Sequence, residues 1–351
     1  MCPAALEGRN NGVSHGSGRR ANELIMVVGY PDAAVAGMVW IPGGGFTMGS
    51  DRHYAEEAPA HPVAVDGFWI DRHPVTNAEF AAFVAAAGHI TAAERQPDPA
   101  DYPNADPVSL VASSAVFVAP RHLVSLDNAY QWWSNVAGAD WRHPRGPGST
   151  LDGLDDHPVV HVACADVEAY AAWAGKELPT EAEWEYASRG GTDGVEYAWG
   201  EELTPSGRHL ANVWQGDFPI TNDETDGYYW TSPVGAFDPN GYGLLDMIGN
   251  VWEWTADWWS VQRRLPTSQP ACCAVGSPAL VRNPVAANAA MSVDPDQPLP
   301  ARIPRRVMKG GSYLCAPNYC RRYRPAARLA QAIDTSTCHL GFRCVVRGNH
   351  K

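Results

Sequence analysis

Glycine and proline interrupt this chain so often that long helices have little room to form between them. Its 351 residues include 33 Gly, 29 Pro and 14 Trp. Glycine and proline both disfavour the interior of helices and strands, whereas tryptophan supplies large flat side chains for a core. Hydrophobic residues make up 45% of the sequence, which is enough for a normal core. The composition therefore predicts a loop-rich fold packed by aromatic side chains, in one large domain or two small ones.

The charge and the cysteines limit the partners and the compartment. A formal net charge of −13 argues against nucleic acid or an anionic membrane as a partner, because both carry negative charge. Residues 1–20 are polar, and the apolar stretch Leu24–Val28 is too short for a signal core or a membrane span. We therefore expect a cytoplasmic protein with reduced thiols. The eight cysteines are then functional or buried rather than a disulfide framework: 2, 164, 272, 273, 315, 320, 338 and 344.

The first third of the chain shows clear local signals. Residues 1–36 lack periodicity and are predicted to be a disordered tail ahead of a domain at 37–348. Met38–Ser50 predicts a strand, a glycine turn and a second strand, and Val63–Ile70 alternates like one further strand. Thr76, with Glu79 three residues later, predicts a capping box at the start of a helix over residues 77–87.

The middle of the chain alternates between loops and helical signals. Residues 97–156 have loop composition with scattered tryptophans, which favours a functional loop or a surface excursion. A helix is predicted near Asp166–Ala174, and Thr180 with Glu183 predicts a second capping box. Ser232–Phe237 is typical of a strand fragment. Residues 262–304, which contain Cys272 and Cys273, are predicted to be a loop insertion.

Cys315 and Cys320 form the most informative pair in the sequence. Side chains five residues apart on a strand point to opposite faces, but the intervening Pro317–Asn318 is a turn signal. We therefore expect a bend that turns the two thiols toward each other. The pair is compatible with a disulfide, a redox pair or half of a metal site. The absence of a Cys-x₂-Cys spacing in the sequence disfavours a four-cysteine zinc site.

Several motifs together resemble one enzyme family, the formylglycine-generating enzymes or sulfatase-modifying factors. The matching stretches are Met38–Ser50, Asp71–Phe80, Trp141–Pro144, Lys176–Tyr186, Asn212–Gly216, Gly249–Trp254 and Gly310–Cys315. Apart from the tail and the insertion, they span the chain from Met38 to Cys344. The resemblance implies an α/β (α+β) fold: a single compact domain with low regular secondary structure, related to C-type lectin-like folds.

The resemblance also implies a chemistry. Cys315 and Cys320 match a pair that binds Cu(I), and thiolates are soft ligands that suit this ion. The substrate would be an unfolded or nascent sulfatase polypeptide with a Cys-x-Pro-x-Arg motif. Its cysteine would be oxidised by O₂ with an external thiol reductant, through a thioaldehyde, to formylglycine. Ser312 and Tyr319 match active-site positions of the family, although each hydroxyl could also simply be satisfied by the loop backbone.

Two structural Ca²⁺ sites are implied in the same way. Loops that mix carboxylate, amide and backbone oxygens are the environment that Ca²⁺ prefers. By resemblance, the ligands of the first site are Asn212, Val213, Asp226 and Tyr228, and those of the second are Asp246, Gly249, Val251 and Glu253.

The sequence also departs from the family. Ala171 and Pro325 stand where secreted members have disulfide cysteines, which leaves Cys344 without an obvious partner, and His339 replaces the usual Asn. Four arginines follow the cysteines and either hold the loop through carboxylates, meet peptide carbonyls or form a solvated face: 321, 322, 324 and 328. Two other functions remain open. One is an iron-dependent sulfoxide synthase, whose His-x₃-His-x-Glu motif the sequence lacks, and the other is a non-catalytic lectin-like binding module.

Overall fold

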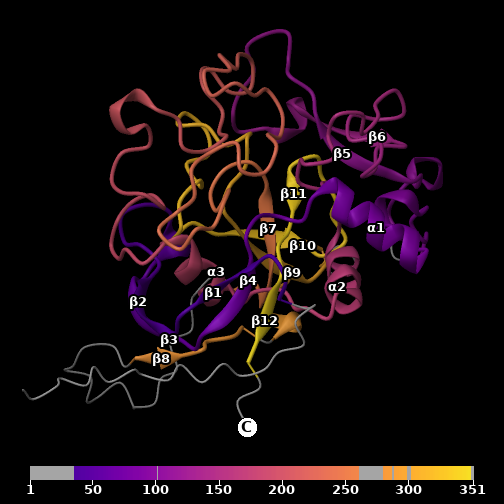
Figure 1. Cartoon of the computed structure of the whole chain (residues 1–351). Coiled ribbons are helices and arrows are strands. Elements are labelled where there is room, and N and C mark those ends of the chain that lie inside the picture. Colours follow the sequence, from indigo (N-terminus) through magenta and orange to yellow (C-terminus); the bar gives the residue numbers. More distant parts are fainter. Residues whose placement is uncertain (1–34, 101, 261–279, 287, 299–301, 349–351) are drawn as a thin grey trace, which may run out of the picture.

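The computed structural model describes residues 35–100, 102–260, 280–286, 288–298 and 302–348 (Figure 1). Nearly all of the predicted tail at 1–36 lies outside these residues, and so do Cys272 and Cys273. The described part is a mixed α/β domain with few helices, as the resemblance implies.

Four strands form the sheet at the centre of the molecule (Figure 1). Their order is β10 (Leu329–Ala332), β9 (Arg305–Lys309), β7 (Trp252–Trp258) and β11 (Leu340–Gly341). The pair β7–β9 is antiparallel and places Glu253 opposite Lys309, whereas β11 joins β7 in parallel. The chain runs from β9 directly into residues 310–328, the cysteine loop, which contains Cys315 and Cys320. It then continues into β10, so this sheet supports both ends of the loop.

Three smaller sheets surround the central one. The first contains β1 (Met38–Ile41), β4 (Phe68–Asp71) and β12 (Val345–Arg347); the second contains β2 (Gly44–Met48), β3 (His61–Val65) and β8 (Val281–Arg282); the third is the hairpin of β5 (Ser113–Phe117) and β6 (Trp133–Ala137). The prediction of one strand over Val63–Ile70 was wrong, because the chain breaks at Asp66–Gly67 and sends β3 and β4 into different sheets.

The predicted helices form where their caps place them. Helix α1 (Asn77–Ala87) begins at Thr76 and α3 (Glu181–Ser188) at Thr180, and both capping boxes are complete. Helix α2 (Cys164–Trp173) begins two residues earlier than predicted. Short 3₁₀ turns complete the described elements: η1 (Ala55–Glu57), η2 (Ala92–Glu94), η3 (Pro107–Ser109), η4 (Ala129–Gln131), η5 (Pro205–Gly207) and η6 (Ala289–Met291). No helix in the described ranges is long and apolar enough to span a membrane.

One loop prediction and one strand prediction need correction. Residues 97–156 contain the β5–β6 hairpin, whose strands pair across a long connection that local composition does not reveal. Ser232–Phe237 forms turns instead of a strand, because Ser232 and Gly235 donate their N–H groups to the side chains of Asn250 and Asp246 and not to a neighbouring strand.

Aromatic side chains fill the core, as the composition indicates. Trp184 of α3 and the β7 residues Trp252 and Trp254 are fully buried in the main apolar cluster. A second cluster lies beside the cysteine loop and contains Phe117, Trp132, Trp214, Phe218 and Tyr313. The site described below is therefore built on loops that rest on two rigid aromatic clusters.

Candidate active site

The cysteine loop begins where β9 ends. Gly311 has a φ of +72°, and a Cβ there would lie 2.9 Å from the backbone of Tyr323, so the turn needs glycine. A turn over residues 317–319 follows, and the N–H of Cys320 donates to the carbonyl of Ala316 at 2.9 Å. This bend turns the two thiols toward each other, as expected, with their sulfurs 3.3 Å apart.

The two cysteines differ in exposure and in acidity. Cys315 is buried, and burial raises the pKa of its thiol. Cys320 is half-buried, and the pKa of its thiol is lowered to about 6, first by the hydrogen bond from Cys315 and then by the charge of Arg322. The lowered pKa favours a thiolate at Cys320, which accepts the S–H of Cys315. Both cysteines are free of disulfide bonds.

Ser312 lies next to the cysteines and is completely buried. Its N–H donates to the sulfur of Cys315 at 3.4 Å. Its hydroxyl accepts the N–H of Leu314 at 3.2 Å and lies 3.1 Å from Nδ1 of His339. The loop therefore places Ser312 against one sulfur and one imidazole.

Tyr319 forms an aromatic wall beside Cys320. The residue is 38% exposed, and its ring stacks on Phe218 at 4.7 Å, with Trp132 edge-on at 5.4 Å. Among the described residues, its hydroxyl has no hydrogen-bond partner. The structure therefore leaves this hydroxyl available to a ligand, whereas the ring itself is fixed by stacking.

The four arginines after the cysteines hold the loop through carboxylates. The ion pairs are Arg321–Glu196 at 3.7 Å, Arg322–Glu56 at 2.6 Å, Arg324–Glu57 at 2.5 Å and Arg328–Glu181 at 2.9 Å. Of the three alternatives that the sequence left open, this geometry agrees with the first. Arg322 also points its Nη1 at the sulfur of Cys320, at 3.9 Å.

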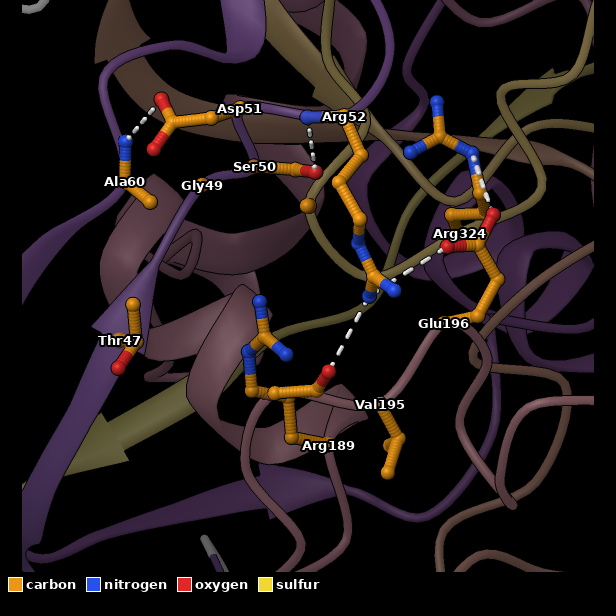
Figure 2. A pocket seen from close by; sticks show the side chains of 12 residues that line it. Thr47, Gly49, Ser50, Asp51, Arg52, Ala60, Arg189, Val195, Glu196 and Arg324 are labelled. Carbon is orange, nitrogen blue, oxygen red and sulfur yellow. Dashed lines mark hydrogen bonds and ion pairs between the residues drawn. The ribbon is translucent and has the colours of Figure 1, made fainter.

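A cavity of about 240 Å³ with several charged side chains in its lining lies beside this loop (Figure 2). Arg52, Arg189, Glu196 and Arg324 contribute charged groups to its lining. Figure 2 shows Glu196 between Arg52 and Arg324, which it approaches to 3.6 and 3.8 Å. The charges of this cavity are thus largely paired by the protein, and the two cysteines are not among its lining residues.

The cysteine pair fits Cu(I) by donor chemistry. Two soft sulfur donors within 3.3 Å can reach a single ion, and Cu(I) accepts such a low coordination number. Cys320 already favours the thiolate form that a metal needs.

The residues of the first expected Ca²⁺ site also come together. The carboxylate of Asp226 accepts the N–H groups of Val213 at 3.2 Å and Tyr228 at 3.0 Å, and the amide nitrogen of Gln215 at 2.6 Å. The same nitrogen of Gln215 donates to the carbonyl of Val213. Among the residues that the structure describes, Oδ1 of Asn212 is buried without a hydrogen-bond partner. A cation would satisfy this oxygen, so the donor set fits Ca²⁺.

Two residues of the second expected Ca²⁺ site share a neighbour, because Nη2 of Arg343 donates to the carbonyl of Asp246 at 3.3 Å and to Oε1 of Glu253 at 2.8 Å. Oδ1 of Asp246 is buried and has no hydrogen-bond partner in the described part of the chain, and a Cβ on Gly249 would lie 2.4 Å from the carbonyl oxygen of Asn212. The carboxylate of Glu253 accepts Trp184 and Arg343, which leaves one lone pair on its Oε1. Val251 is buried and offers a backbone oxygen alone. The set fits an oxygen-preferring cation, although the described residues hold no cluster of three His, Cys, Asp or Glu side chains.

Sequence reasoning missed the aromatic frame of the site. Trp132, Trp133 and Phe218 surround the loop but come from segments that the pattern describes as irregular. For the two tryptophans, the density of aromatic residues in 97–156 was the available signal, whereas Phe218 lies outside that segment. Cys344, which lacks a cysteine partner, is buried, and its N–H donates to Asp71 at 2.8 Å.

Known proteins resemble this chain over most of its length. The family model described as "Sulfatase-modifying factor enzyme 1-like domain" matches residues 27–348. A formylglycine-generating enzyme of Mycobacterium tuberculosis is 51% identical over 308 residues, which cover 88% of this chain and 97% of that protein. A Mus musculus relative named "Inactive C-alpha-formylglycine-generating enzyme 2" is 37% identical over 312 residues, covering 88% and 84%.

The fold has solved counterparts as well. The structure of PvdO from Pseudomonas aeruginosa aligns with a TM-score of 0.52 at 25% identity, covering 89% of this chain and 94% of that one. Because the family model and the relatives cover most of the chain, this protein belongs to the sulfatase-modifying factor family, the family of the formylglycine-generating enzymes.

Proposed function

We propose that this protein oxidises the cysteine of a Cys-x-Pro-x-Arg motif in sulfatase polypeptides to formylglycine, with Cu(I), O₂ and an external thiol. The observation that carries the proposal is the approach of the Cys315 and Cys320 sulfurs to 3.3 Å in a loop held by ion pairs. The names of its relatives support the same activity. One substrate cysteine, one O₂ and two thiols would give one aldehyde, one hydrogen sulfide, one water and one disulfide.

Copper would be held by Cys315 and Cys320, and it would supply the oxygen activation that a non-acidic Cβ–H bond requires. The chain's own residues prepare this site. Cys320 offers a thiolate near the surface, while the N–H of Ser312 supports the buried sulfur of Cys315 at 3.4 Å. Tyr319 closes one side with an aromatic ring whose hydroxyl is available to the bound peptide.

We also propose that Ca²⁺ binds the two oxygen-rich sites as a structural ion. The unpaired buried oxygens of Asn212 and Asp246 support this assignment, because buried polar atoms normally have partners. The free state of the five described cysteines supports a reducing compartment such as the cytoplasm, and the net charge of −13 argues against nucleic acid or membrane partners.

Mass spectrometry of a Cys-x-Pro-x-Arg peptide tests the proposal. The peptide is incubated with copper-loaded protein, O₂ and thiol, and we expect the aldehyde product. Cys315→Ser and Cys320→Ser should each abolish it, whereas Cys164→Ser, at a buried thiol that begins α2, should keep it. No aldehyde from the copper-loaded wild type would refute the enzyme.

A binding module is the second candidate, because one relative of this family carries the name of an inactive protein. A module would not need the two sulfurs. If the wild type bound the peptide without product, and both serine variants bound it equally well, the module would replace the enzyme as the conclusion.

A further inference from the structure

The hydroxyl of Ser312 has one hydrogen to donate and two lone pairs. One lone pair accepts the N–H of Leu314 at 3.2 Å. The side chain is completely buried, and within the described residues Nδ1 of His339, at 3.1 Å, is the one acceptor within reach of its hydrogen. A buried hydroxyl that kept its hydrogen unpaired would be costly. The hydrogen of Ser312 therefore points at His339, and one lone pair of Oγ stays open.

The surroundings of His339 suit the role of an acceptor. Its ring lies edge-on to Trp133 at 4.9 Å, which limits its rotation. Burial lowers the pKa of the imidazole to about 3, with a smaller effect of His161, so the ring is neutral at physiological pH. A neutral ring that accepts at Nδ1 carries its proton on Nε2. Its backbone is fixed too, because its carbonyl accepts the N–H of Trp252 at 2.8 Å.

We propose that His339 is a positioning residue of the active site, which acts by holding the hydroxyl of Ser312 in one orientation. This inference rests on the proposed function. With its hydrogen held by His339 and one lone pair held by Leu314, Ser312 can only present its last lone pair as an acceptor. The S–H of a substrate cysteine is a donor that this lone pair can accept once the bound peptide displaces the groups that bury Ser312. His339 thus orients the substrate thiol through Ser312, without touching it.

Variants at position 339 test the positioning role by steady-state kinetics of aldehyde formation. His339→Ala removes the acceptor and should lower kcat by roughly tenfold, the scale of one lost hydrogen bond. His339→Asn, with a side-chain oxygen close to the place of Nδ1, should restore most of the rate. The affinity for Cu(I), measured by competition with bicinchoninate, should stay the same in both, because neither cysteine is touched.

A double-mutant cycle separates positioning from a structural effect. If His339 acts through Ser312, His339→Ala should cause no further loss in a Ser312→Ala background. His157→Ala is the matched control, because Nδ1 of His157 lies 2.9 Å from the hydroxyl of Thr231 in a similar pair outside the cysteine loop. This control should keep kcat within about twofold of the wild type.

A second measurement does not depend on activity. Nitrogen NMR of the metal-free protein labelled at histidine should show His339 as the Nε2–H tautomer, with the assignment taken from His339→Asn. An Nδ1–H tautomer, additive losses in the cycle, or a His339→Ala enzyme as fast as the wild type would overturn the inference. If the wild type makes no aldehyde, the proposed function and the positioning role of His339 are both refuted. The tautomer measurement then tests only the hydrogen bond between Ser312 and His339.

Discussion

Glu57→Gln should destabilise the protein strongly, whereas the same change at the preceding residue should not. Glu57 and Arg324 form a buried bidentate pair, with oxygen–nitrogen distances of 2.5 and 2.8 Å. Glu56 pairs with Arg322 in the same loop, but both side chains are about one-fifth exposed, at 21% and 19%. The two changes therefore remove one charge each from neighbouring positions of η1 and differ mainly in burial.

The expected magnitudes follow from this difference. Leaving one partner of a fully buried ion pair uncompensated costs about 3–5 kcal/mol, whereas a pair that water still reaches, as at Glu56 and Arg322, contributes closer to about 0.2–1 kcal/mol. Glu196 lies 3.8 Å from Nε of Arg324 and still compensates part of its charge, so we expect about 3 kcal/mol for Glu57→Gln. With an unfolding entropy of about 2.1 cal/mol/K per residue, this corresponds to a Tm lower by roughly 4 °C.

Differential scanning calorimetry of the metal-free proteins measures both effects. We expect Glu56→Gln to lower Tm by no more than about 1 °C. The same Tm for Glu57→Gln and wild type would refute the claim that buried ion pairs anchor the cysteine loop. An equal loss in both variants would show that burial does not decide their contribution.

Three further predictions follow from the site and the core. Alkylation of Cys320 by iodoacetamide should reach half of its maximal rate near pH 6. Arg322→Met should move this midpoint to higher pH, because a charge that favours the thiolate is lost. An unchanged pH profile would contradict this effect of Arg322 on Cys320. Burial, and less strongly the charge of Glu181, raise the pKa of Asp257 to about 6 from its usual 3.8. This carboxyl therefore favours the folded state most below pH 3.8 and loses that contribution as the pH rises through about 6. Urea unfolding should show stability falling by about 2–3 kcal/mol over this range, and Asp257→Asn should flatten the fall. Calcium chelation should lower the Tm of the wild type but not of Asn212→Ala, and an equal shift in both would count against the first calcium site.

Local signals in the sequence predicted local structure well. Thr76 with Glu79, and Thr180 with Glu183, lie within one helical turn, so their capping boxes depend on few other residues. The bend between Cys315 and Cys320 was predictable for the same reason, because Pro317 and Asn318 favour a turn wherever they occur.

Contacts between distant segments were not predictable. Strands β5 and β6 pair although residues 118–132 separate them, and the local sequence of Ser113–Phe117 does not indicate with which strand it pairs. Ser312 and His339 are in contact although 27 positions separate them in the sequence. The sequence could therefore mark His339 as unusual but could not show which residue it contacts. The sequence could therefore identify residues of the site, whereas the geometry of the site depends on the central sheet and could not be predicted.

Titration of the reduced protein with Cu(I) against a competing chelator tests the central claim most directly. We predict that each protein molecule binds one Cu(I) tightly, at Cys315 and Cys320. This binding should be lost in Cys315→Ser and in Cys320→Ser, and it should be kept in Cys164→Ser. Tight binding that survives both serine variants would place the metal elsewhere and contradict the account, and so would a wild type that binds no Cu(I).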